Sequence, residues 1–212
     1  INYRFLAPAD LRRARVSTDA VPLANPLSEE RSVMRTSLLP SLVAAASVAL
    51  RHQARSVSLF EVGRSFHPRG PSDVTADPAD MNLPVEREWL SVLLAGAADT
   101  WLGDERAFDF YDLKGRVETL VHGLVGTLPE LLADDPLAES ALALHPRRRA
   151  AVRVAGETLG VIGELHPEVV DDFGLDGRPL YAELDMQALE RASQRVGVTQ
   201  AGELPRFQVT VS

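Results

Sequence analysis

LFEVGRSF, at residues 59–66, is the stretch that decides the fold. Polar and apolar side chains alternate from residue 57 to residue 66, and β-formers are frequent, a pattern typical of a strand. EREWLSVLLAG, at residues 86–96, predicts a second strand. Residues 67–85, between them, combine prolines, aspartates and small side chains with little apolar content. This composition predicts a mobile, dispensable loop.

The rest of the chain predicts further strands and several helices. Asp109 is a good cap for a helix with apolar residues at 3- and 4-residue spacing, and prolines open shorter helices at Pro8 and Pro167. A final helix is predicted at 186–192, and extended segments at 1–6, 21–27, 140–145, 150–154, 158–163 and 180–185, with a tight turn near 155–157. Tight turns between neighbouring strands favour a mainly antiparallel sheet with helices packed on it, an α+β architecture.

The helix predicted from Thr36 or Ser37 to Arg55 is unusually apolar. Its apolar stripe is wide and comprises Leu38, Leu42, Ala46 and Ala49, with Leu39, Val43 and Leu50 beside them. A helix this apolar is packed on more than one side. We expect it to contact both the sheet of its own domain and another subunit.

Length and composition narrow the class of protein. The chain has 212 residues, of which 45% are hydrophobic, enough for one substantial core, and its net charge of -8 supplies no global attraction to nucleic acid or an anionic membrane. There is no cysteine, and the five histidines lie far apart, so we expect neither disulfides nor a structural metal. No apolar run approaches the ~20 residues of a membrane span, and we expect a cytoplasmic protein. The start at Ile1 suggests a piece of a longer chain.

Four motifs together carry a family resemblance. NPLSEERSVMRTSLLPSL (25–42), LFEVGRSF (59–66), FYDLKG (110–115) and LGVIGELHPEV (159–169) resemble, in this order, the catalytic-like module of the phenylalanyl-tRNA synthetase beta subunit. The resemblance runs over nearly the whole chain. It implies a class II aminoacyl-tRNA synthetase-like antiparallel sheet flanked by helices. We assign residues 1–204 to this module and 205–212 to the start of a linker or strand into a following domain.

The resemblance also shows which residues are missing. In the active alpha subunit, the segment matching LFEVGRSF continues into consecutive arginines, one of which grips the α-phosphate of the nucleotide. Here Gly63 and Arg64 are followed by Ser65, Phe66, His67 and Pro68, which cannot supply a fixed guanidinium. The glycine-rich third motif, which ends in an arginine, has no counterpart after Asp185. We therefore expect no catalytic or cofactor-binding residue in this chain.

Residues 25–42 lie where the family builds its subunit interface, so the resemblance implies that they help dock the alpha subunit. The candidate interface residues are Asn25, Arg35, Leu38, Leu39, Leu42 and Val43. Arg35 precedes a helix, whose positive end disfavours a cation unless a carboxylate compensates. Glu61 is one candidate partner, and a solvated Arg35 is the alternative.

The remaining motif residues favour structural roles. Glu61 and Arg64 lie three apart and face opposite sides of a strand, so structural salt bridges are the better reading of that pair. In FYDLKG, Asp112 suits the start of a helix, Lys114 does not, and Gly115 permits a close approach of helix and sheet. In GELHPEV, Glu164 ends a strand, His166 is a cap and Pro167 opens a helix. No third ligand accompanies the Glu-x-His pair.

The resemblance implies a noncatalytic module of an (αβ)2 enzyme. Its alpha subunit binds phenylalanine and ATP with magnesium, and other beta domains edit and contact tRNA. The isolated piece is then prone to self-association. Two other functions remain open on sequence: a paralogue that still activates an amino acid, and a regulatory module that kept a pocket for a small amino acid.

Overall fold

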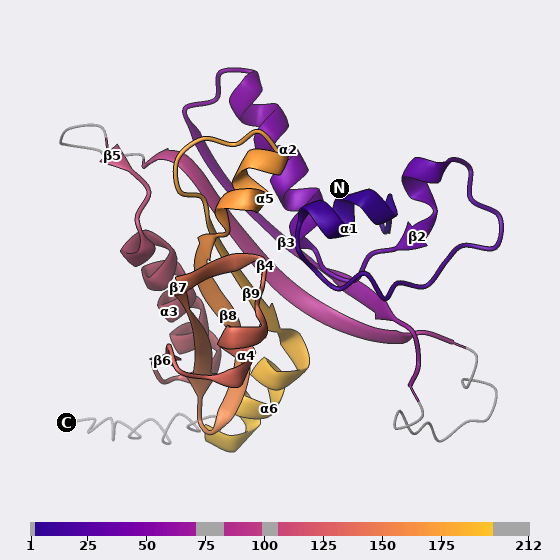
Figure 1. The fold of residues 1–212 in the computed structure, drawn as a ribbon. Helices are drawn as coiled ribbons and strands as arrows, with labels where there is room; N and C mark the ends of the chain where they lie inside the picture. The colour runs from indigo at the N-terminus through magenta and orange to yellow at the C-terminus, as the bar shows by residue number, and fades with distance from the viewer. Residues whose placement is uncertain (1–2, 71–82, 99–105, 197–212) are drawn as a thin grey trace, which may run out of the picture.

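A mainly antiparallel sheet with helices on both faces forms the body of the protein. The computed structural model describes residues 3–70, 83–98 and 106–196. Within these residues every strand pair is antiparallel, and the main sheet has the order β3-β4-β9-β8-β7-β6 (Figure 1). Its strands are β3 (Ser56–His67), β4 (Val85–Ala98), β6 (Glu130–Leu132), β7 (Leu144–Val154), β8 (Glu157–Leu165) and β9 (Leu180–Asp185). The short β5 (Arg106–Ala107) pairs with the end of β4. The α+β prediction is confirmed.

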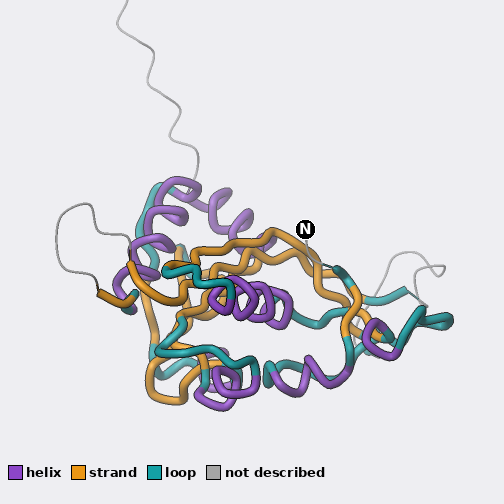
Figure 2. Tube along the Cα trace, turned by 90° about the horizontal axis from the view of Figure 1, so that it is seen from above, coloured by secondary structure: helices purple, strands orange, loops and turns teal. Residues whose placement is uncertain are grey.

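Helices cover each face of the sheet. One face packs against α3 (Phe110–Val125) and α6 (Met186–Val196), and the other against α2 (Leu39–Arg51) and α5 (Pro167–Asp172). The short α1 (Pro8–Arg13) packs on α2 and α5. Figure 2 shows helices on both sides of the strands. A small second sheet joins β1 (Phe5–Leu6) to β2 (Val33–Met34), and the remaining elements are η1 (Glu29–Arg31) and α4 (Pro136–Ser140).

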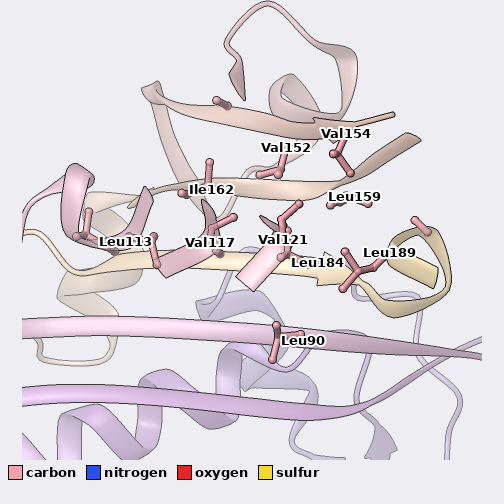
Figure 3. Close-up of a cluster of buried hydrophobic side chains, with 14 of the residues drawn as sticks. Leu90, Leu113, Val117, Val121, Val152, Val154, Leu159, Ile162, Leu184 and Leu189 are labelled. Carbon is pink, nitrogen blue, oxygen red and sulfur yellow. The ribbon is translucent and has the colours of Figure 1, made fainter. Parts of the chain in front are cut away.

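Strand alternation divides the core into two apolar clusters. Even-numbered residues of β4 and β9, such as Leu90 and Leu184, face α3 and α6, where they meet Val117 and Val121 of α3 (Figure 3). Odd-numbered residues of the same strands face α2 and α5, and Leu93 is one of them. The sheet is therefore buried on both faces along its central strands.

The strongest sequence patterns gave the right elements. The strands predicted at 57–66 and 86–96 are β3 and β4, each slightly longer than expected, and the strand predicted at 180–185 has those bounds. Asp109 caps α3 as predicted, because its carboxylate accepts from the backbone N–H groups of Tyr111 and Asp112. The turn after β7 is left-handed at Ala155 and Gly156, a conformation that suits a two-residue hairpin connection.

Other expectations need correction. The apolar helix runs over Leu39–Arg51 and not from Thr36 or Ser37 to Arg55, because Pro40 lies in its first turn and the chain turns back at Gln53, which is left-handed. The strands predicted at 140–145 and 150–154 are one strand, β7, with a register shift between Leu144 and Arg149.

Several short elements differ from the sequence prediction as well. Ser140 ends α4, which Asp135 caps, and α4 was not predicted. In the segment predicted to be extended at 21–27, Pro22 pairs with Val33 as an isolated bridge. Most of the predicted loop, residues 71–82, lies outside the described residues, as do residues 197–212 with the predicted boundary at 204.

Candidate functional site

Glu183 stands at the centre of a buried polar cluster below the start of α2. Its Oε1 atom accepts from the Tyr181 hydroxyl at 2.9 Å, the Ser37 hydroxyl at 3.1 Å, the Ser91 hydroxyl at 3.3 Å and the Leu38 backbone N–H at 3.4 Å. Ser91 and Tyr181 also lie 3.0 Å apart, oxygen to oxygen. We call the side chains of Ser37, Ser91, Tyr181 and Glu183 the Glu183 cluster.

Sheet register assembles this cluster. Ser91 on β4 pairs directly with Glu183 on β9, and Tyr181, two residues before Glu183, faces the same side of the strand. Ser37 lies just before α2, where its Oγ also accepts from the Leu39 N–H at 3.1 Å. The cluster therefore joins the first turn of α2 to two central strands.

Burial dominates the protonation behaviour of the cluster. Removal from water raises the pKa of the Glu183 carboxyl, although the hydrogen bonds from Tyr181, Leu38, Ser37 and Ser91 oppose this shift. Burial, reinforced by the neighbouring Glu183 charge, raises the pKa of Tyr181 well above its ordinary value. Tyr181 therefore stays a neutral hydrogen-bond donor at neutral pH.

The second carboxylate oxygen of Glu183 is different from the first. Among the residues that the structure describes, no hydrogen bond reaches Oε2. No fully buried side-chain oxygen in these residues lacks a partner, so Oε2 is accessible. Glu183 lines an open cavity of about 550 Å³, and this cavity is what Oε2 can reach.

The walls of this cavity combine polar and apolar side chains. Besides Glu183, Asp19 contributes a carboxylate, and the apolar part includes Val16, Leu144 and Val161. Arg15 is the basic side chain among the described lining residues. Its guanidinium is already engaged by the carboxylate of Glu168 and, at 3.0 Å, by the Leu142 carbonyl. Cavity and carboxylate together form a candidate binding site for a small molecule.

Of the two alternatives for Arg35, the structure has the ion pair with Glu61 and not the solvated side chain. Arg35 is 3% exposed, its Nη1 donates to Glu61 Oε1 at 2.7 Å, and its Nε donates to the Arg64 carbonyl at 2.8 Å. A Cβ at Gly63 would overlap with Nη2 of this guanidinium, so a larger residue there would displace the Arg35 side chain. Arg64 itself pairs with Glu86 at 2.7 Å, at the surface, and Glu61 and Arg64 thus form separate salt bridges as expected.

Most of the predicted interface residues lie inside the domain. Besides Arg35, the side chains of Leu38, Leu39, Leu42 and Val43 are buried in the chain's own core, whereas Asn25 is exposed. In this conformation the buried side chains offer no surface to a partner. Any contact made by α2 falls to its outward positions, such as Ala44 and Val48.

The other motif residues mostly have the structural contacts expected of them. Asp112 completes a capping box with Asp109 and accepts two hydrogen bonds from Arg106, at 2.6 and 2.7 Å, which lower the pKa of Asp112 to about 2. Lys114 pairs with Glu118 one turn later. The prediction for Gly115 was wrong, because a Cβ there would meet nothing within 4 Å.

The GELHPEV segment behaves as a strand end followed by a helix cap. Glu164 pairs with Arg148 at 2.6 Å, and β8 ends one residue later. His166 caps α5 by accepting from the Glu168 N–H at 3.2 Å, and Pro167 is in the first turn. Within residues 3–70, 83–98 and 106–196, no group of three histidine or acidic side chains could hold a metal ion.

Comparison with known proteins gives this fold a family. The family model described as "Phenylalanyl tRNA synthetase beta chain CLM domain" matches residues 1–186. The chain belongs to this family. Phenylalanine--tRNA ligase beta subunits from Pasteurella multocida and Cupriavidus pinatubonensis are 35% identical over 210 residues and 32% identical over 217 residues. These alignments cover 98% and 100% of the chain but 24% of each relative. The chain thus spans about a quarter of the length of the curated relatives it matches.

In this CLM domain, the end of β3 carries no free cation toward the cavity. After Arg64, which pairs with Glu86, the Ser65 hydroxyl accepts from Trp89 Nε1 at 2.8 Å and lies 3.0 Å from His67 Nε2. Burial and the nearby Arg87 lower the pKa of His67, so its ring is neutral near pH 7. The end of β3 is therefore filled by hydrogen-bonded polar side chains of the domain itself.

The arginines of α6 also point away from the Glu183 cavity. Arg191 and Arg195 of α6 both pair with Glu157, at 3.3 and 2.6 Å, where β8 begins after the hairpin turn. None of these three residues lines the Glu183 cavity. No described helix of the domain is long and apolar enough to cross a membrane.

Sequence reasoning missed the Glu183 cluster. Its members come from three separate segments, and Ser37 and Glu183 are 146 positions apart. One local signal was present: Glu183 interrupts LYAELD, a strand of otherwise mostly buried side chains. A carboxylate among the buried side chains of a central strand indicates a polar site, because such a group needs hydrogen-bond partners.

Proposed function

We propose that this CLM domain is a noncatalytic structural module of a phenylalanine–tRNA ligase beta subunit. In this proposal it has a class II synthetase-like core, and it supports aminoacylation by holding the alpha subunit. ATP and magnesium act at the alpha subunit, tRNA binds the assembled (αβ)2 enzyme, and the enzyme works in the cytoplasm. The beta-subunit relatives support this assignment, and the antiparallel sheet with helices on both faces fits a class II-like core.

The ion pairs of the described arginines Arg15 and Arg64 support the noncatalytic part of the proposal. Adenylyl transfer develops negative charge on phosphate oxygens, which fixed guanidinium groups stabilise. Arg15, at the cavity, is engaged by Glu168, and Arg64 by Glu86. An ATP phosphate in this cavity would meet the carboxylates of Asp19 and Glu183 instead.

The outward face of α2 is the observation that carries the docking proposal. Ala44 and Val48 are exposed there, and Val48 is 48% exposed. Tyr3 and Phe5 line the same groove of about 470 Å³, next to α2. An apolar helix face beside exposed aromatic side chains suits burial against another protein. We assign the alpha subunit as the protein that binds this face, because the relatives are named as beta subunits and a beta subunit implies an alpha subunit in the same enzyme.

Two matched lysine substitutions test this docking. Val48→Lys puts a cation on the outward face of α2, and Leu124→Lys does the same on α3, where Leu124 is 53% exposed. Both positions lie in the last turn of their helices, where a cation suits the helix dipole, so neither should unfold the domain. We expect Val48→Lys to weaken binding of purified alpha subunit at least about tenfold, roughly 1.4 kcal/mol, and Leu124→Lys to leave it unchanged.

The readout is the dissociation constant for the alpha subunit, with circular dichroism as a check on folding. Ala44→Lys serves as a second variant on the same face. Equal affinity of the wild type and both α2 variants would place the interface elsewhere. In the absence of the alpha subunit, the same face should drive concentration-dependent self-association, and Val48→Lys should reduce it.

A further inference from the structure

A structural role accounts for Oε1 of Glu183, which joins α2 to the sheet, but not for Oε2. Burying a carboxylate costs free energy, and an apolar side chain of similar volume between two central strands would stabilise the sheet at least as well. The four donors on Oε1 hold the carboxylate in one orientation, with Oε2 left to the cavity. This arrangement is a fixed hydrogen-bond acceptor directed at a space that can admit a small molecule.

The charges around the cavity favour a ligand with a positive charge. Glu183 and Asp19 both line it, while the guanidinium of Arg15 is engaged by the carboxylate of Glu168. An anion would therefore face two carboxylates without a free cation to compensate. A ligand with N–H donors and a positive charge would instead complete the hydrogen bonding of Oε2 and offset the buried negative charge.

The apolar part of the cavity wall favours an apolar group on the ligand. Val16, Leu144 and Val161 present aliphatic surface to the same cavity. Its volume of about 550 Å³ lies within the range of small-molecule sites, which are mostly apolar with a few fixed polar groups. A compact apolar body attached to the cationic head would fill this part.

We propose that the Glu183 cavity binds a small primary amine, with its ammonium group on Glu183 Oε2 and a compact apolar body against Val16, Leu144 and Val161. An amine is preferred to a zwitterionic amino acid, because the cavity has no free cation among its described lining residues to receive an α-carboxylate. This site lies on the inner side of α2 and is independent of the docking face on its outer side.

Benzylamine is the probe, with benzyl alcohol and benzoate as the neutral and anionic matches of similar shape. Titrations of the whole chain, followed by the methyl resonances of its valines and leucines, give the three affinities. We expect saturable benzylamine binding at least tenfold tighter than that of benzyl alcohol, and no binding of benzoate. Phenylalanine should bind more weakly than benzylamine. Equal binding of amine and alcohol, or tighter binding of phenylalanine, would overturn the proposal.

Two substitutions assign the binding to this cavity. Glu183→Gln keeps an acceptor for the four donors but removes the charge, and it should lower benzylamine affinity at least tenfold. Glu190→Gln removes an exposed carboxylate on α6 and should leave the affinity unchanged. Val161→Phe fills the apolar part of the cavity and should abolish benzylamine binding. This variant tests the site independently if Glu183→Gln does not fold. Full benzylamine affinity in folded Val161→Phe would contradict the site.

Discussion

Substituting Arg35 by methionine tests how the segment before α2 is held to the sheet. The Arg35 guanidinium joins this segment to β3 through Glu61, at 2.7 Å, and through the Arg64 carbonyl, at 2.8 Å. The backbone bond from the Phe66 N–H to the Arg35 carbonyl, at 2.8 Å, does not depend on the side chain. Arg35→Met therefore removes the charged contacts and keeps the apolar stem and the backbone pairing.

The structure sets the size of the effect. Removing one partner of a buried ion pair costs about 3–5 kcal/mol, because the other charge is left uncompensated. Glu61 is 15% exposed and keeps some contact with water, so the lower end applies, about 3 kcal/mol. Glu61→Gln retains an acceptor and should cost about 2 kcal/mol. The double variant should cost about 3 kcal/mol and not the sum, a coupling of about 2 kcal/mol.

Urea denaturation at neutral pH, followed by tryptophan fluorescence, measures these free energies of unfolding. The Arg64–Glu86 pair is a matched control, because it has the same 2.7 Å separation but side chains that are 54% and 45% exposed. Arg64→Met should cost less than about 1 kcal/mol. If Arg35→Met costs no more than Arg64→Met, or if the double variant is additive, burial of the Arg35 pair does not determine its contribution.

Two further predictions concern single carboxylates. Asp109→Ala removes the acceptor for two backbone N–H groups at the start of α3 and should cost about 1 kcal/mol, read from the melting temperature; an unchanged value would argue against this cap. Glu183 has a folded-state pKa raised above 4.5, so the folded protein binds this proton more readily than the unfolded chain. Relative to Glu183→Gln, the stability of the wild type should fall as pH rises from about 4.5 through the folded pKa, and urea midpoints that run parallel across this range would contradict it.

The regular part of the fold could be predicted where one local pattern dominates. Alternation in β3, β4 and β9 and the cap at Asp109 act over a few residues, so the sequence contains the whole signal. β7 was predicted as two strands, and Pro146, which has no N–H to donate to a neighbouring strand, lies between them. The structure tolerates the proline through the register shift between Leu144 and Arg149. That accommodation depends on how β7 pairs with β8, and this register is not contained in any local pattern.

The Arg35–Glu61 pair and the Glu183 cluster also differ in how far local sequence predicts them. Glu61 could be named as one candidate partner of Arg35 because a cation before a helix requires compensation, while a solvated Arg35 stayed an equal alternative. The Glu183 cluster depends on the β4–β9 register and on where α2 begins, and neither follows from local sequence. Pro40 shortened α2 and placed Ser37 and the Leu38 N–H on Glu183. Tertiary register, and not residue type, created this site.

Phenylalanine-dependent exchange of pyrophosphate into ATP tests the noncatalytic assignment most directly. Arg64 and Arg195 pair with Glu86 and Glu157 and do not line the Glu183 cavity. Arg15, which does line it, pairs with Glu168. The isolated chain should therefore give the exchange rate of a control without protein. Exchange well above that control, retained after contaminating synthetase has been removed and lost in Glu183→Gln, would show that the chain activates an amino acid and would contradict the account.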